Sequence, residues 1–173
     1  MRDGIDIEFR EVGMRDGLQN VEGFFPTEAK IAWMKAEVTS GMHAIEICSF
    51  VPPKLIPQFK DAVEVVKATH ATDTGDCIIS ALIPNMRGAE RGVELGMKKL
   101  NFVASVSETH NLSNVRRKPE ESIEDFRRIV EMRNALLDER KFVIDGGLST
   151  AFGCTMEGNV DPAATVKLAQ QFV

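Results

Sequence analysis

The stretch Glu11-Val-Gly-Met-Arg-Asp-Gly-Leu-Gln-Asn20 follows an alternating segment, Ile5-Asp-Ile-Glu-Phe9. Alternation of apolar and polar residues predicts a strand over residues 5–9. The stretch then places Arg15 and Asp16 at the carboxyl end of that strand, where catalytic groups lie in an α/β barrel. Asp16 is a hard oxygen ligand suited to a divalent metal, and Arg15 is suited to hold an oxyanion. The alternative interpretation is a surface turn whose two charges are merely solvated.

Strand and helix patterns alternate along the rest of the chain. Thr27 follows Pro26 and is expected to cap a helix that runs to Ser40 and stops at Gly41. Further strands are expected over 43–47, 76–83, 99–105 and 142–148. Further helices are expected over 58–70, from a cap at Asn85 to Gly96, from Pro119 onward, and from Asp161-Pro162 onward.

This alternation predicts an α/β fold with a parallel sheet and right-handed crossovers. Composition shows no linker or repeat that would divide residues 1–173, so a single domain is expected. Periodicity alone leaves two architectures open, a doubly wound sheet and an arc of a barrel. Because no Gly-x-Gly-x-x-Gly follows the first strand, a dinucleotide-binding function is disfavoured.

Composition disfavours several classes of protein. Hydrophobic residues make up 43% and charged residues 27% of the chain, which is typical of a globular domain. A run of about 18 apolar residues, as a membrane span requires, is absent from the sequence. The net charge of −5 and the lack of a large Lys/Arg cluster argue against nucleic-acid partners. The first residues resemble neither a signal peptide nor a transit peptide, so a cytoplasmic location without membrane partners is expected.

The three cysteines, Cys48, Cys77 and Cys154, are widely spaced and form no Cys-x-x-Cys pair. This pattern argues against a disulfide framework and against a structural zinc site. Cys77 is expected to be a small core residue. Cys48 and Cys154 lie near predicted strand ends, where either core packing or contact with a pocket remains open.

Several blocks of the sequence resemble the 3-hydroxy-3-methylglutaryl-CoA (HMG-CoA) lyase family. The first stretch is similar to the family's Arg-Asp-Gly-Leu-Gln signature. Later blocks resemble the ends of its second to fifth strands, in family order: Ile45–Gln58, Leu82–Gly88, Ser105–Asn114 and Gly147–Gly158. Arg10, Met14 and Val21 depart from the common pattern and leave the exact substrate open.

The resemblance implies a partial TIM barrel, with residues 1–173 as the N-terminal part of one barrel domain of about five strand–helix units. The family takes metal ligands from a His-x-His pair and a catalytic cysteine from a glycine-rich loop, and both lie beyond these blocks. His43, His70 and His110 form no such pair. The 173-residue chain alone is therefore expected to be inactive.

The implied reaction is cleavage of HMG-CoA to acetyl-CoA and acetoacetate, as in leucine degradation and ketone body metabolism. The resemblance implies an acyl-CoA thioester substrate, a complete enzyme that is a homo-oligomer, and a Mg²⁺ or Mn²⁺ ion held partly by Asp16. Arg15 would stabilise the developing negative charge. Three alternatives remain: a citramalyl-CoA type lyase, a 2-alkylmalate-type condensing enzyme, and a truncated non-catalytic fragment.

In a barrel, the candidate site residues gather at one end. Arg15 and Glu46 are expected to be catalytic. Glu46 lies between two apolar residues, so it faces the enclosed interior and needs a partner, for which Arg15 is suited. Substrate contacts are expected from the ends of all five strands: Gln19, Ser49, Asn85, Ser107, Glu108, Ser149 and Thr150.

Three of these residues have plainer roles open to them. Asn85 is suited to capping a helix, and Ser107 to capping the turn after its strand. Glu108 is suited to pairing with Arg116 or Arg117. The short basic run 116–118 is either a solvated loop or a contact to CoA phosphates.

Overall fold

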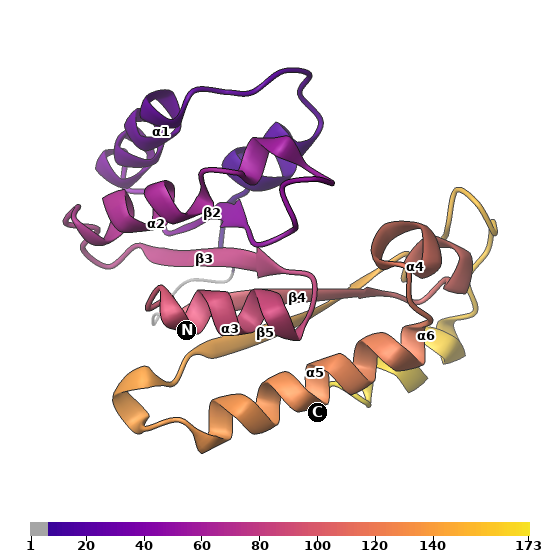
Figure 1. Cartoon of the computed structure of the whole chain (residues 1–173). Coiled ribbons are helices and arrows are strands. Elements are labelled where there is room, and N and C mark those ends of the chain that lie inside the picture. The colour runs from indigo at the N-terminus through magenta and orange to yellow at the C-terminus, as the bar shows by residue number, and fades with distance from the viewer. Residues whose placement is uncertain (1–6) are drawn as a thin grey trace.

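A curled, five-stranded parallel sheet forms the centre of the computed structural model, which describes residues 7–173 (Figure 1). The strands pair in chain order: β1 (Arg10–Glu11), β2 (Ala44–Ser49), β3 (Ile78–Ile83), β4 (Lys99–Ser105) and β5 (Val143–Ser149). A doubly wound sheet reverses its strand order, whereas a barrel wall does not. The fold is therefore a curled half-barrel, a part of a TIM barrel, as the family resemblance implies.

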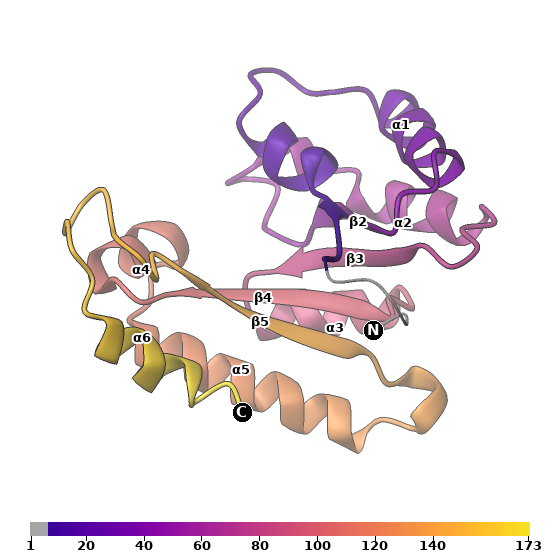
Figure 2. The same ribbon diagram turned by 180° about the vertical axis from the view of Figure 1, so that it is seen from behind.

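At least one helix follows each strand, and most of these helices cover the convex face of the sheet. They are α1 (Thr27–Thr39), α2 (Ala62–His70), α3 (Met86–Glu94), α4 (Glu108–Val115), α5 (Pro119–Ala135) and α6 (Pro162–Ala169), with short turns η1 (Gly13–Gly17), η2 (Pro57–Phe59) and η3 (Asp138–Arg140). In Figure 1, α3 and α5 lie in front of the sheet, and in Figure 2 the strands β4 and β5 lie in front of these helices. Within residues 7–173, no helix is long and apolar enough to cross a membrane.

The hydrophobic core fills the space between this convex face and the helices. Alternate residues of β2 and β4, such as Ile45 and Phe102, are almost fully buried there. Phe102 packs on Phe126 of α5, and Phe126 packs on Phe172, with ring centroids 5.5 and 4.5 Å apart. A Cβ atom at Gly146 of β5 would lie 2.2 Å from the Phe172 ring, so glycine is needed for this close approach.

Most predicted elements are confirmed to within a few residues, but the first strand is wrong. Residues 7–9 form no strand, and Ile7 and Phe9 are each 75% exposed; residues 5 and 6 lie outside the described residues. Pairing with β2 begins only at Arg10 opposite Ala44. An alternating pattern forms a strand only where a neighbouring strand covers its hydrogen bonds, and the sequence does not show where that cover begins.

Three smaller expectations also need correction. The helix predicted over 58–70 is divided into η2 and α2. Thr27 is the first residue of α1, which has no side-chain cap. Ser107 caps a full helix, α4, rather than only a turn, because its hydroxyl accepts the His110 N–H at 3.0 Å.

A buried ion pair joins α1 to the segment before α2. Lys30 Nζ lies 2.8 Å from Asp61 Oδ1, and both side chains are nearly inaccessible to solvent. Lys30 also donates to the carbonyl oxygen of Gln58. Since a buried charge is tolerated only when it is paired, each partner depends on the other.

We predict that Lys30→Met lowers the free energy of unfolding by about 3–5 kcal/mol, because it leaves the Asp61 charge buried and unpaired. The double variant Lys30→Met/Asp61→Leu should recover most of this loss. Urea unfolding followed by circular dichroism measures both. Lys141→Met, which removes the partner of the exposed Asp138, is the matched control and should change little. Equal losses in the Lys30 and Lys141 variants would contradict the prediction.

A second ionic cluster crosses the concave face of the half-barrel. Asp145 of β5 lies 3.0 Å from the Arg10 guanidinium of β1 and 2.9 Å from Lys99 Nζ of β4. Although partial burial raises the pKa of Asp145, the hydrogen bonds and charges of Lys99 and Arg10 outweigh burial and lower it. The first and fifth strands are thereby joined across the interior.

We predict that Asp145→Asn is less stable than the wild type at neutral pH and equally stable in strong acid. A lowered pKa in the folded state stabilises the fold above the ordinary aspartate pKa, about 4, and this contribution disappears as the pH falls through the lowered value. Urea midpoints measured from pH 7 to pH 2 check it. A difference that is independent of pH would show that Asp145 acts by packing alone.

Candidate active site

The signature turn is a single π-helical turn, η1, that follows β1 directly. The N–H groups of Arg15, Asp16 and Gly17 all point at the Val12 carbonyl, at 3.0, 2.7 and 3.3 Å. Met14 anchors the turn in the core. A Cβ atom at Gly13 would lie 2.8 Å from the Trp33 ring of α1, so the turn can press against α1 only with glycine there. This anchoring holds Arg15 and Asp16 at the carboxyl end of the sheet.

Arg15 connects the turn to the concave face of the sheet. Its Nε donates to Oε2 of Glu46, and its Nη1 donates to Oδ1 of Asp16 at 2.7 Å. The Glu46 side chain is only 2% exposed. The predicted partnership of Glu46 with Arg15 is confirmed, and it neutralises a carboxylate that would otherwise be buried alone.

Asp16 is the exposed end of this cluster. Its side chain is 52% exposed, and Gln19 Nε2 donates to its Oδ1 at 3.2 Å. Asn20 donates to its main-chain carbonyl at 2.8 Å. The structure therefore brings Asp16 and the predicted substrate contact Gln19 together at the solvent-facing side of Arg15.

Asn101 of β4 belongs to the same cluster, although the sequence did not single it out. Its Nδ2 donates to Glu46 Oε1 at 2.5 Å and to Ser80 Oγ at 3.1 Å. Like Glu46, it is a polar residue between two apolar ones, Leu100 and Phe102. That alternation places it on the concave face and is the signal that would have found it.

A hollow of about 510 Å³ opens beside this cluster on the concave face. Its walls come from β1, β2, β3, β4 and β5, and its polar lining is supplied by Arg10, Arg15, Glu46, Asn101 and Asp145. Each of its two guanidinium groups is paired with a carboxylate of the lining, Arg10 with Asp145 and Arg15 with Glu46, and only their remaining N–H groups are available to ligand oxygens.

The residues predicted at the ends of β4 and β5 lie together and bond to one another. Thr150 Oγ1 accepts the Ser107 N–H at 3.0 Å and donates to the Ser149 carbonyl at 2.6 Å. Thr150 has a left-handed backbone, φ 59°, which is uncommon for a β-branched residue. Glu108 pairs with Lys118 at 3.6 Å, so the expected pairing with Arg116 or Arg117 is wrong.

Ser49 and Asn85 make local bonds at the ends of β2 and β3. Ser49 Oγ accepts the Val51 N–H at 3.2 Å, and Asn85 Oδ1 accepts the Gly88 N–H at 3.0 Å. The plainer role of Asn85 as a helix cap is therefore confirmed. Substrate contact by either residue stays a prediction.

The cysteines differ in their surroundings. Burial raises the pKa of the Cys48 thiol strongly, and the nearby carboxylates of Glu46 and Asp61 raise it further, so Cys48 is an unreactive core residue. Partial burial also raises the pKa of Cys77. In contrast, a hydrogen bond with Ser107 lowers the pKa of Cys154 in the loop after β5.

The residues described supply only part of the ligand set that a divalent metal ion needs. Asp16 supplies a carboxylate in contact with solvent, and carboxylate oxygen is the ligand that Mg²⁺ and Mn²⁺ prefer. Within the described part of the chain, no group of three or more His, Cys, Asp or Glu side chains could hold a metal ion. Asp16 therefore fits as one ligand, and further ligands are needed.

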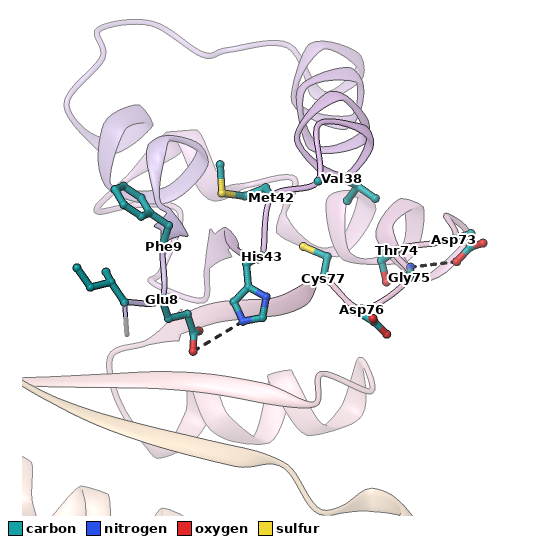
Figure 3. Close-up of a pocket in the computed structure, with 12 residues that line it drawn as sticks. Glu8, Phe9, Val38, Met42, His43, Asp73, Thr74, Gly75, Asp76 and Cys77 are labelled. Atoms are coloured by element: carbon teal, nitrogen blue, oxygen red, sulfur yellow. Dashed lines mark hydrogen bonds and ion pairs between the residues drawn. The ribbon is translucent and has the colours of Figure 1, made fainter. Parts of the chain in front are cut away.

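A larger hollow of about 660 Å³ lies at the opposite, amino end of the strands (Figure 3). It is lined by residues that precede β1, β2 and β3, including Glu8, His43 and Cys77, with His43 Nε2 3.8 Å from Glu8 Oε2. In barrels of this kind, chemistry takes place at the carboxyl ends of the strands. We take the smaller hollow as the candidate active site, because it contains both predicted catalytic residues, Arg15 and Glu46.

Known proteins share both the sequence and the fold of this chain. The family model HMGL-like matches residues 6–173. A hydroxymethylglutaryl-CoA lyase of Bacillus subtilis is 36% identical over 165 residues, which cover 95% of this chain and 53% of that protein. The human mitochondrial hydroxymethylglutaryl-CoA lyase is 31% identical over 166 residues, which cover 96% of this chain and 49% of that protein.

The solved structure of an HMG-CoA lyase from Acinetobacter baumannii, in complex with coenzyme A and 3-methylmalate, superposes with a TM-score of 0.84 at 38% identity. The match covers 94% of this chain and 51% of that one. The chain spans about half the length of these relatives. With a family model that matches nearly every residue and the same half-barrel fold, the chain belongs to the HMGL-like family.

Proposed function

We propose that the complete protein is a carbon–carbon lyase that cleaves HMG-CoA into acetyl-CoA and acetoacetate. The observation that carries the proposal is the Arg15–Asp16 turn, fixed to the buried Glu46 at the carboxyl end of the sheet. The chain's membership of the HMGL-like family supports the same reaction, as do the lyase names of its relatives in bacteria and animals.

An acyl-CoA thioester is the substrate class that we propose. The Acinetobacter baumannii relative binds coenzyme A together with 3-methylmalate, a hydroxylated dicarboxylate. The hollow beside Arg15 offers guanidinium groups for such carboxylates. Substrate contacts are proposed for the residues at the strand ends: Gln19, Ser49, Asn85, Ser107, Glu108, Ser149 and Thr150.

The proposed chemistry is a retro-aldol cleavage, the reverse of the addition of a thioester enolate to a ketone. The 3-hydroxyl loses its proton, the bond between C2 and C3 breaks, and the electron pair moves onto the thioester as an enolate, which takes up a proton to give acetyl-CoA. Arg15 uses Nε for Glu46 and Nη1 for Asp16, and its Nη2 has no partner among residues 7–173. That remaining N–H₂ group is suited to stabilise the oxygen on which negative charge develops.

A Mg²⁺ or Mn²⁺ ion is the proposed cofactor, with Asp16 as one ligand. Bound there, such a cation would polarise the substrate oxygens and lower the pKa of the hydroxyl. Arg15 and Gln19 both donate to Asp16 Oδ1, while Oδ2 accepts no hydrogen bond from residues 7–173 and is available to a ligand.

We also propose the oligomeric state, location and metabolic role of the complete protein. It would be a cytoplasmic homo-oligomer that acts in leucine degradation and ketone body metabolism. A zebrafish relative is named as cytoplasmic, whereas several others are named as mitochondrial. Citramalyl-CoA cleavage and 2-alkylmalate synthesis are the competing reactions. A coupled assay of the complete protein with each substrate decides among them, and activity with only a competing substrate would overturn the proposal.

We predict that Asp16→Asn weakens activation of the complete enzyme by Mg²⁺ or Mn²⁺ by at least about tenfold, because the variant loses a charged oxygen ligand. The measurement is activity against metal concentration after treatment with a chelator. Asp138→Asn, which changes an exposed carboxylate before β5 at the opposite end of the sheet, is the control. Full activity of the chelated wild type, or the same metal requirement in the Asp16 variant, would exclude Asp16 as a ligand.

We predict that Arg15→Lys lowers kcat much more than it raises KM. Lysine keeps the charge but loses the planar fork that binds Glu46 and Asp16 at once, so the cation is no longer aimed at the reacting oxygen. An interaction made mainly in the transition state appears in kcat. Steady-state kinetics with HMG-CoA measure both constants, and a change in KM alone would make Arg15 a substrate-binding residue instead.

A further inference from the structure

Asn101 lies in the middle of β4 on the concave face, where it is 5% exposed. Its Nδ2 makes two contacts, with Glu46 Oε1 at 2.5 Å and with Ser80 Oγ at 3.1 Å. Ser80 is held in turn, since its hydroxyl donates to the Ile45 carbonyl at 3.3 Å. The amide nitrogen of Asn101 is therefore fixed between β2 and β3.

The oxygen of the same amide, in contrast, destabilises the fold because it is buried without a hydrogen bond. Among the buried side-chain atoms of residues 7–173, Asn101 Oδ1 is the one without a hydrogen-bond partner. A buried acceptor that loses its water without gaining a donor costs about 1–3 kcal/mol. An apolar residue of similar size would avoid this cost but would remove the donor of the buried Glu46 Oε1, so the bond to Glu46 is what distinguishes asparagine here.

What Asn101 does provide is a second anchor for Glu46. With Arg15 alone, only Oε2 of Glu46 is held, and the carboxylate is free to rotate about its last bond. The Asn101 amide holds Oε1 as well, which fixes the plane of the carboxylate. Since the Arg15 guanidinium is planar and its Nε bonds to this carboxylate, its orientation depends on the same anchor.

We propose that Asn101 is a positioning residue of the candidate active site. It fixes the Glu46 carboxylate and, through it, the direction in which Arg15 presents its remaining N–H groups. The expected effect on the catalytic rate rests on the proposed lyase function. The expected effect on the orientation of Arg15 rests on the geometry alone. A site held rigidly by supporting hydrogen bonds needs no rearrangement during the reaction.

A double-mutant cycle in the complete protein tests the effect on rate. Asn101→Leu should lower kcat by about tenfold or more, the equivalent of one hydrogen bond to a charged group, with a much smaller change in KM. If Asn101 acts through Glu46, the same substitution in a Glu46→Ala background should lower kcat no further. Thr69→Val, which removes a buried side-chain hydrogen bond within α2 and away from the concave face, is the control and should keep kcat within about twofold.

A chemical measurement tests the geometry without turnover. Phenylglyoxal modifies accessible guanidinium groups, and mass spectrometry of the peptide that carries Arg15 gives its rate. This rate should rise severalfold in Asn101→Leu and stay at the wild-type value in Thr69→Val. Melting temperatures of each variant identify general unfolding, which would accelerate modification of all arginines alike.

The two measurements separate failure of the inference from failure of the proposed function. A wild-type protein that cleaves none of the thioesters would refute the lyase reaction, while the rate of Arg15 modification would still decide on Asn101. Multiplicative losses of kcat in the cycle, or an unchanged rate of Arg15 modification in Asn101→Leu, would overturn the positioning role.

Discussion

The ion pair between Arg15 and the buried Glu46 is the interaction on which the candidate site depends. It joins a turn after the first strand to the interior of the sheet, and it gives a nearly inaccessible carboxylate the partner that such a charge requires. The other groups are placed relative to it: Asp16 and Gln19 on the solvent side and Asn101 on the sheet side. Loss of Arg15 would leave the Glu46 charge in a region that cannot solvate it.

The two faces of the sheet differ in polarity and in role. The convex face is apolar, and residues such as Ile45, Leu100 and Phe102 bury it against the helices, which supplies the hydrophobic stabilisation of the fold. The concave face instead carries Glu46, Asn101 and Asp145. Such groups stabilise a fold poorly, because their desolvation offsets what their pairing contributes. Their gathering beside one hollow, at the end of the strands where barrels place chemistry, connects the fold with the proposed reaction.

Local patterns were sufficient for much of the fold and part of the site. The bounds of β4, the start of α5 at Pro119 and the capping role of Asn85 follow from short-range chemistry that acts within a few residues. The partnership of Glu46 with Arg15 could be predicted because a carboxylate between two apolar strand residues must face an enclosed space. Asn101 shows the same alternation but was missed, since a neutral amide signals a buried polar contact less strongly than a charge does.

The alternation of strands and helices, the family resemblance and the signature residues could be read from the sequence, because each depends on residues close together along the chain. The start of β1, the cation that Glu108 contacts and the contact of Arg10 with Asp145 became known only from the folded structure. These outcomes depend on which strands lie opposite one another and how strongly the sheet curls. The contact between Arg10 and Asp145 joins residues 135 positions apart, and a local sequence pattern spans far fewer residues than that.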